Sequence, residues 1–249
     1  VKRNLRDFNK DLRINELDNY FWDDFTNYLF SQNLANNTVN LRLTKFKTFL
    51  NKISEWGYQH KITGFKKPKE DINNIYLDKD ELEKLQTYQP TSKREEITKD
   101  KMIIQCFTAY RISDLKRISA ENKILKGNLY IIRMNAIKNF NKTYIPLRNN
   151  CVKILKKYEW KLPTISDQKY NKNIKQLLKN AGITREVEIK RNMGGKREII
   201  KTPINEVFSS HDCVKTGISY YLNKGFSPAE VAGMTGKNID TIMKYYYPN

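Results

Sequence analysis

The stretch that decides the fold is SSHDCVKTGISYYLNKGFSPAEVAGMTG, residues 209–236. Within it, residues 211–223 are predicted to form a helix that is ended by Gly225. The following segment 227–230, Ser-Pro-Ala-Glu, supplies an N-cap, a proline at the first helical position and a capping-box glutamate. These stop and start signals predict two helices joined by a short turn.

On both sides of this pair the chain is predicted to be mainly helical, with a small antiparallel sheet. A last short helix begins at Asp240 and carries three consecutive tyrosines at 245–247. Upstream, β-prone runs on either side of residues 127–128, followed by residues 143–147, predict three antiparallel strands. Residues 193–195 predict a hairpin between two basic segments. Further helices are predicted from residue 78 and over residues 97–109, 149–158 and 167–181.

A separate helical domain is predicted ahead of a linker. Residues 16–32 and 37–57 each carry an apolar stripe at helical spacing. Segment 64–71 contains a proline and has no apolar periodicity, which is typical of a linker. We therefore expect a helical domain with its linker over residues 1–75 and a second domain over 76–249.

The composition favours a nucleic-acid partner. The 249 residues include 46 Lys and Arg against 27 Asp and Glu, and residues 76–249 hold +15 of the net charge of +19. Such an excess attracts polyanions, and a generic solubilising charge is the alternative explanation. Three cysteines, Cys106, Cys151 and Cys213, lack a CxxC motif or a His pair, so we expect a reducing, cytoplasmic setting without disulfides, metal or cofactor. No apolar run approaches the roughly 18 residues of a membrane span, so we expect no membrane association.

Four basic residues lie off the apolar stripe of the helix predicted over 37–57. They are Arg42, Lys45, Lys47 and Lys52. Side chains in these positions are able to reach the phosphates of DNA, although a solvated helix face is an equally good explanation. We therefore treat these four residues as candidate DNA-binding residues.

Three features of the second domain are candidates for chemistry on phosphate groups. Arg111 follows an apolar helix, where a guanidinium is uncommon unless it is paired or binds an anion. His211 stands at a helix start, where backbone N–H groups also favour anions. A phenol of the triplet 245–247 is able to act as a nucleophile towards phosphate. Each feature alone also has a structural explanation: a buried ion pair, a helix cap, and core packing.

The order of these features along the chain resembles the tyrosine recombinase, or phage integrase, family. Segment 108–115, TAYRISDL, is similar to the family's first-arginine motif, and segment 138–147, KNFNKTYIPL, to its β-hairpin lysine segment. SSHDC at 209–213 resembles the start of its His-x-x-Arg box, and residues 222–246 have its closing layout. Residues 16–58 are similar to its helical core-binding domain.

This resemblance implies a fold and a reaction. The fold is a helical, SAM-like core-binding domain followed by a mixed α+β catalytic-type domain with a small antiparallel sheet. The reaction is site-specific recombination or integration of double-stranded DNA without a metal, through a 3′-phosphotyrosine and a free 5′-hydroxyl, with a homo-tetramer on the DNA. The implied roles are a phosphate clamp for Arg111, leaving-group protonation for Lys138 or Lys142, proton transfer or phosphate binding for His211, and nucleophilic attack for Tyr246.

Two departures from the family pattern bear on activity. Val214 stands where the family has a second arginine, and a valine donates nothing to a phosphate. Lys237 stands where His or Trp is usual, and its ammonium partly fills that site without the two-pronged geometry of an arginine. Lys215 is adjacent to Val214 but about 100° around the helix. Gly217 also occupies a helical position where a bulky apolar residue is expected, at a cost of about 1 kcal/mol relative to Ala.

Three rival functions stay open at the level of the sequence. A degenerate relative that binds DNA without cutting it is favoured by Val214. A basic RNA-binding or ribosome-associated protein explains the charge but not the ordered Arg, Lys, His and Tyr. A type IB topoisomerase-like activity shares the chemistry and relaxes supercoils without strand exchange.

Overall fold

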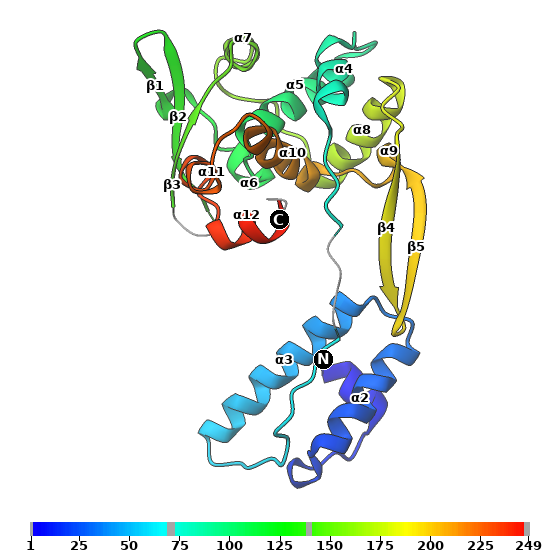
Figure 1. The fold of residues 1–249 in the computed structure, drawn as a ribbon. Coiled ribbons are helices and arrows are strands. Elements are labelled where there is room, and N and C mark those ends of the chain that lie inside the picture. Colours follow the sequence, from blue (N-terminus) through cyan, green and yellow to red (C-terminus); the bar gives the residue numbers. More distant parts are fainter. Residues whose placement is uncertain (1, 69–72, 138–140, 247–249) are drawn as a thin grey trace. The chain divides into compact units, whose positions relative to one another are not determined.

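The computed structural model describes residues 2–68, 73–137 and 141–246, which are arranged in two units (Figure 1). Unit one comprises Val1–Asn73 together with Glu188–Lys201. Unit two comprises Asn74–Val187 and Thr202–Asn249. Among the described residues, no helix has both the length and the apolar character needed to cross a membrane. Each unit has its own hydrophobic core.

Unit one is helical, and both helices predicted within it are confirmed. They are α2 (Asn19–Ser31) and α3 (Asn36–Glu55), preceded by α1 (Lys2–Phe8) and the 3₁₀ turn η1 (Ile14–Glu16), which the apolar pattern did not reveal. Asp18 caps α2, because its Oδ1 accepts a hydrogen bond of 2.8 Å from the Phe21 N–H. The apolar stripes of α2 and α3 then face each other and bury Trp22, Phe25, Leu29, Val39, Leu43, Phe46, Leu50 and Ile53.

The first part of the predicted linker packs against this helical core. The Trp22 indole N–H donates a hydrogen bond of 2.9 Å to the Lys66 carbonyl, and the Phe65 ring lies edge-on to Trp22 with 5.0 Å between centroids. The Asn40 side-chain amide donates a hydrogen bond of 2.8 Å to the carbonyl of Pro68. Residues 65–68 therefore follow the surface of unit one, which their lack of apolar periodicity did not indicate.

A β-hairpin completes unit one. Strands β4 (Glu186–Met193) and β5 (Lys196–Pro203) confirm the predicted hairpin, and its two turn glycines have positive φ. The Gly194 N–H donates to the Leu34 carbonyl at 3.0 Å, and Asn73 exchanges two side-chain hydrogen bonds with the backbone of Lys190. The β4–β5 hairpin, which is distant in sequence, therefore packs on the α2–α3 turn. No local sequence pattern predicts this contact.

Unit two surrounds the long helix α5 (Lys93–Thr108), in which every residue from Thr98 to Thr108 is buried. Helix α5 begins four residues earlier than predicted, because Ser92 caps it. The predicted three-stranded antiparallel sheet is confirmed, with its strands in chain order over residues 123–126, 129–135 and 142–146. The remaining elements are α4 (Lys79–Thr87), α6 (Ile112–Leu115), η2 (Ala120–Asn122), β1 (Lys123–Lys126), β2 (Leu129–Asn135), β3 (Lys142–Pro146), α7 (Asn149–Lys157), α8 (Asp167–Asn180), α9 (Ile204–Val207), α10 (Ser210–Asn223), α11 (Pro228–Thr235) and α12 (Ile239–Tyr245).

Helices α5 and α10 approach each other closely at Gly217 (Figure 1). A Cβ atom added to Gly217 would lie 2.6 Å from the Cys106 carbonyl oxygen and 2.9 Å from the Ala109 Cβ, well inside van der Waals contact. The expectation of a bulky apolar residue here was wrong, because the helix contact leaves space for hydrogen alone. Gly217 thereby brings the middle of α10 next to the end of α5.

Candidate active site

Arg111 lies in the turn between α5 and α6. The chain leaves α5 through Ala109, which adopts the left-handed conformation with φ +50°, and Arg111 is the N-cap residue of α6. Its side chain is half-buried, and the buried Nη1 finds no hydrogen-bond partner among the described residues. An unsatisfied buried donor is costly, and an acceptor from outside the chain would recover that free energy.

Two hydrogen bonds connect residues 110–114 to the sheet and the residues that follow β2. The hydroxyls of Tyr110 and Thr143 lie 2.9 Å apart, and the Asp114 carboxylate accepts a hydrogen bond of 3.0 Å from the Ile137 N–H. The end of β2 is thereby held beside Arg111. The candidate Lys138 lies outside the described residues, and the alternative Lys142 is an exposed residue at the start of β3.

His211 is positioned by the cap of α10. Ser209 is the N-cap, and its N–H donates to the Asp212 carboxylate at 2.9 Å. Part of the His211 side chain stays exposed. Its partial burial lowers its pKa, and the positive charges of Lys215, Lys237 and Arg111 lower the pKa further. The negative charge of Asp212 acts in the opposite direction. Three cations from three elements therefore lie within electrostatic range of one imidazole.

Lys237 is placed by the glycine before it. Gly236 ends α11 with φ +65°, and a Cβ atom there would lie 2.9 Å from the Cγ2 of Thr143 in β3. The Asn141 side-chain amide donates a hydrogen bond of 3.3 Å to the Gly236 carbonyl. Docking of α11 on the sheet thus brings the half-buried Lys237 to the side of the site formed by β3.

Val214 is part of an apolar cluster. It is 3% exposed and belongs to a cluster of buried residues from the end of α5 and from α10, α11 and α12, namely Ala109, Ile218, Tyr221, Val231 and Ile242. Its neighbour Lys215 donates a hydrogen bond of 2.8 Å to the Asp212 carboxylate, and both of these side chains are largely buried. The position where the family has its second arginine is therefore apolar, and the adjacent ammonium is in an ion pair.

Tyr246 follows α12 and packs against the same apolar cluster. Burial raises its pKa to about 12, and the negative charge of Asp212 acts in the same direction. The end of α12 is held by Asn74, whose side-chain amide donates a hydrogen bond of 2.7 Å to the Tyr245 carbonyl. Tyr246 is therefore a protonated phenol at neutral pH, within electrostatic range of the Asp212 carboxylate.

The structure thus gathers four of the five predicted catalytic residues in unit two. The charges of Arg111 and Lys237 act on His211, and the charge of Asp212 acts on both His211 and Tyr246. Asp212 was not predicted, although its place three residues after Ser209 is the signal of a capping box. Among the described residues, no group of three or more His, Cys, Asp or Glu side chains is arranged to hold a metal ion.

The four basic residues of α3 occupy different environments. Lys45 is exposed and Arg42 is half-buried. The Lys47 ammonium lies over the Phe65 ring, 4.3 Å from its centroid, and Lys52 forms a 2.6 Å ion pair with Glu55. Lys47 therefore has a packing role in unit one, which the helical pattern alone did not distinguish from phosphate binding.

Comparison with known proteins gives one domain match and several matches over the whole chain. Residues 1–63 match the family described as Phage integrase SAM-like domain. No protein with a curated description matches the sequence. At 14% identity, three solved structures cover 99%, 100% and 99% of this chain: XerH site-specific recombinase bound to difH substrate, the Tn1549 transposon integrase with circular intermediate DNA, and a lambda integrase dimer bound to a core site.

The TM-scores of these three matches are 0.68, 0.69 and 0.70, and the matches span 72%, 88% and 85% of the respective proteins. The resemblance inferred from the ordered motifs is confirmed, as is the mainly helical fold class with a small antiparallel sheet. The chain therefore has the fold of the tyrosine recombinases, with a phage integrase SAM-like domain over residues 1–63.

Proposed function

We propose that this chain is a DNA-binding site-specific recombinase or integrase that breaks and rejoins strands through a 3′-phosphotyrosine intermediate. The observation that carries the proposal is the unpartnered, buried Nη1 of Arg111, whose charge acts on His211 together with those of Lys215 and Lys237. A phosphodiester is the ligand that this arrangement fits, because negative charge grows on its nonbridging oxygens during phosphoryl transfer. The net charge of +19 supports double-stranded DNA as the partner.

Each group has a defined part in the proposed reaction. The Tyr246 oxygen attacks the scissile phosphorus and forms a bond to the 3′-phosphate, while the bond to the 5′-oxygen breaks and that oxygen takes up a proton. Because the pKa of Tyr246 is raised to about 12, attack requires a base. His211 has a lowered pKa, so it is neutral at pH 7 and able to accept the phenolic proton or to hold the phosphate.

The mechanism also needs a second cationic donor to the phosphate, in place of the family's second arginine. Lys237 is our candidate, since it follows the end of α11 and its charge acts on His211. Lys215 is the alternative, and its ion pair with Asp212 opposes a direct phosphate contact. The proton for the leaving 5′-oxygen is assigned to Lys138, and its role stays a prediction from the family motif.

A second candidate function is DNA binding without strand cleavage. Val214 favours it, because this buried valine lies in an apolar cluster at the position of the family's second arginine. On this alternative, the chain binds duplex DNA through its two units, with Arg42, Lys45 and Lys52 contacting phosphates, and no covalent intermediate forms.

Trapping with a suicide DNA substrate separates the two candidates. The full chain should form a covalent protein–DNA adduct, and Tyr246→Phe should abolish the adduct with duplex binding nearly unchanged, since only the nucleophilic oxygen is removed. Tyr245→Phe is the matched control and should keep the adduct. Absence of any adduct from a chain that binds the duplex would establish the binding-only function. If Tyr245→Phe abolishes the adduct and Tyr246→Phe keeps it, the nucleophile is Tyr245.

A further inference from the structure

A polar side chain is buried in the apolar part of helix α5. Gln105 has no exposed surface, and its neighbours Ile104 and Cys106 belong to the hydrophobic core of unit two. A buried amide costs free energy unless its donor and its acceptor both find partners. An apolar side chain of similar volume avoids that cost. What distinguishes Gln105 is therefore the set of partners of its amide.

Both ends of the Gln105 amide are hydrogen-bonded. Its Nε2 donates to the main-chain carbonyl of Tyr110 at 3.0 Å, and its Oε1 accepts from the Tyr170 hydroxyl at 3.2 Å. Tyr110 and Tyr170 are buried as well. Burial raises the pKa of the Tyr170 phenol, so this group stays protonated and acts as the donor. The Tyr170 hydroxyl therefore leaves the NH₂ end of the amide for the Tyr110 carbonyl.

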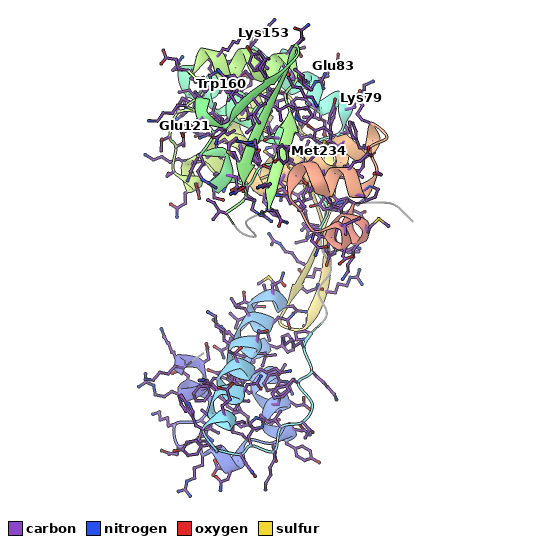
Figure 2. The ribbon with its side chains drawn as sticks, turned by 90° about the vertical axis from the view of Figure 1, so that its left-hand side faces the viewer. Lys79, Glu83, Glu121, Lys153, Trp160 and Met234 are labelled. Carbon is purple, nitrogen blue, oxygen red and sulfur yellow. The ribbon has the colours of Figure 1, made fainter. Side chains whose placement is uncertain are left out.

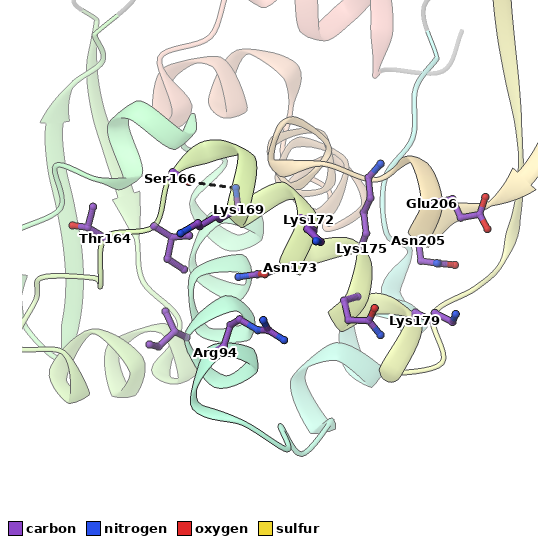
Figure 3. A pocket seen from close by; sticks show the side chains of 13 residues that line it. Arg94, Thr164, Ser166, Lys169, Lys172, Asn173, Lys175, Lys179, Asn205 and Glu206 are labelled. Atoms are coloured by element: carbon purple, nitrogen blue, oxygen red, sulfur yellow. Dashed lines mark hydrogen bonds between the residues drawn. The ribbon is translucent and has the colours of Figure 1, made fainter.

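Tyr170 is brought to Gln105 by the start of helix α8, which packs against α5 (Figure 3). Ser166 is the N-cap of α8, and its hydroxyl accepts a hydrogen bond of 3.4 Å from the Lys169 N–H (Figure 3). Tyr170 follows within the first turn, and the Lys101 ammonium lies over its ring, 5.4 Å from the centroid. These contacts hold the Tyr170 ring with its hydroxyl directed at α5.

The acceptor of the Gln105 amide belongs to the peptide group that enters Arg111. The Tyr110 carbonyl and the Arg111 N–H form one planar unit. The chain changes direction at this point, because Ala109 has φ +50° and Arg111 is the N-cap of α6. At the other end of Tyr110, its hydroxyl is bonded to Thr143 of β3. Tyr110 is therefore held at its carbonyl by α5 and at its hydroxyl by the sheet.

We propose that Gln105, oriented by Tyr170, is a positioning residue for Arg111 and acts through the Tyr110 carbonyl. This inference rests on the proposed reaction at Arg111. The buried Nη1 of Arg111 has no hydrogen-bond partner among the described residues, so the direction of this side chain depends on its main chain. Rotation of the peptide before Arg111 displaces the guanidinium, and a displacement of about 1 Å is able to cost on the order of 10²-fold in rate.

Single-turnover adduct formation at saturating duplex separates positioning from binding. Gln105→Met keeps the volume and removes the donor, so the rate should fall about 10- to 100-fold. The dissociation constant of the duplex should stay within about twofold of native, because it depends on many phosphate contacts.

Lys99→Met is the matched control for Gln105→Met. Lys99 is also a largely buried side chain of α5 that donates to a main-chain carbonyl, that of Tyr88. Its loss should leave the rate of adduct formation near that of the native chain. Lys153→Met removes the same charge from an exposed position of α7 and accounts for any effect of charge alone (Figure 2).

Gln105→Glu provides a rescue by protonation. A protonated carboxyl group at position 105 accepts from Tyr170 and donates its O–H to the Tyr110 carbonyl, whereas the ionised form has no donor. Its rate, divided by the native rate at the same pH, should rise as pH falls from about 9 to 6. The ratio for Gln105→Met should stay constant. The Tyr110 and Tyr170 phenols have pKa values raised by burial and stay protonated over this range.

Tyr170→Phe tests the same contacts from the other end and keeps the core filled. Without the hydroxyl the Gln105 amide is able to turn, so the rate should fall, by less than in Gln105→Met. Because Tyr170 acts through Gln105, the double variant should be no slower than Gln105→Met alone. Losses that multiply in the double variant would contradict the proposal.

Phosphate binding without DNA makes the test independent of strand cleavage. Inorganic phosphate should shift the NMR resonance of the Arg111 Nε–H, which is identified by its absence in Arg111→Lys. Gln105→Met should raise the dissociation constant of phosphate at this resonance about threefold or more, and Lys99→Met should not.

The outcomes distinguish the positioning role from the reaction. The positioning role is wrong if the native chain forms the adduct and Gln105→Met cleaves as fast, if Lys99→Met is as slow as Gln105→Met, or if the Gln105→Glu ratio does not depend on pH. Absence of adduct from a native chain with the phosphate response described above counts against strand cleavage alone. A native chain that shows neither adduct nor phosphate response would overturn both.

Discussion

Val214 is the single residue with the largest expected effect on activity. A missing charged donor at a phosphoryl-transfer centre costs on the order of 10²–10³ in rate. Val214→Arg should therefore raise the rate of adduct formation by about 10². Because Val214 is buried in an apolar cluster, the same change should lower the free energy of unfolding by about 1–3 kcal/mol.

Single-turnover adduct formation and urea denaturation measure the two effects of this change. Val214→Met is the control, since it adds bulk without a donor and should give no gain in rate. If Val214→Arg binds DNA but stays as slow as the native chain, the loss of activity extends beyond one residue. The binding-only function then replaces the recombinase.

His211 predicts how stability depends on pH. Its pKa is lowered in the folded chain by burial and by the charges of Lys215, Lys237 and Arg111. Between the ordinary pKa of about 6.5 and the lowered one, the unfolded chain binds a proton that the folded chain does not. Its contribution to stability is therefore complete above pH 6.5 and is lost as pH falls through that value towards the lowered pKa.

Urea denaturation at pH 7.5 and 5.5 measures this effect. His211→Gln should lose less stability than the native chain on acidification, because it removes the titrating group. His60→Gln, at the chain's other histidine, is the control and should behave like the native chain. An identical loss for native and His211→Gln chains would show that His211 is not the group responsible.

At the scale of elements, Gly217 controls the contact between α5 and α10. Helix propensity alone predicts that Gly217→Ala stabilises the chain by about 1 kcal/mol. The structure predicts the opposite sign, a loss of about 1–3 kcal/mol, because the new Cβ would lie 2.6 Å from the Cys106 carbonyl oxygen. Gly233→Ala in α11 is the control, since its added Cβ meets nothing within 4 Å and should be neutral or stabilising.

Urea denaturation of both glycine variants decides between propensity and packing. A stabilised Gly217→Ala chain would mean that α5 and α10 are further apart than the structure shows. Equal effects of the two substitutions would have the same meaning.

Elements with strong local signals were predictable from the sequence. The cap and proline before α11, the stripes of α2 and α3, and the strand runs of the three-stranded sheet are local patterns, and the structure confirms them. Short elements such as α6 and α9 were not predictable, because four residues carry too little periodicity. The close approach at Gly217 was also hidden, since it depends on a helix more than a hundred residues earlier.

The candidate site was predictable to a different degree. Local features made Arg111, His211 and the tyrosine triplet candidates, and their order along the chain then favoured them as one set with Tyr246 as the nucleophile. The Lys215–Asp212 ion pair and the unpartnered Nη1 of Arg111 are tertiary features. Sequence alone has no signal for them, because they depend on which side chains the fold brings together.

At the scale of the whole molecule, the β4–β5 hairpin determines whether the fragments produced by proteolysis stay together. The boundary near residue 75 predicts first cleavage in the segment 64–74. The released N-terminal fragment should nevertheless stay bound to the rest of the chain, because residues 188–201 belong to unit one and the Gly194 N–H bonds to the Leu34 carbonyl. The two fragments should co-elute in native gel filtration and separate in denaturant.

Gly194→Val tests the role of the hairpin in holding these fragments together. Gly194 has φ +56°, and a Cβ there would lie 3.3 Å from the Phe30 carbonyl oxygen, so the fragments should separate more readily. Gly127→Val, at a turn with similar φ and no atom within 4 Å of the added Cβ, controls for turn strain. First cleavage within residues 100–150, or fragments that separate at once from the native chain, would contradict this organisation.

The most direct test of strand cleavage is to identify the atom that becomes attached to DNA. The chain is incubated with a suicide substrate, digested, and the nucleotide-bearing peptide is sequenced by mass spectrometry. The account predicts a 3′-phosphate on the Tyr246 oxygen and a free 5′-hydroxyl on the released strand. Attachment to another residue, or no attachment in a chain that binds the duplex, would contradict it.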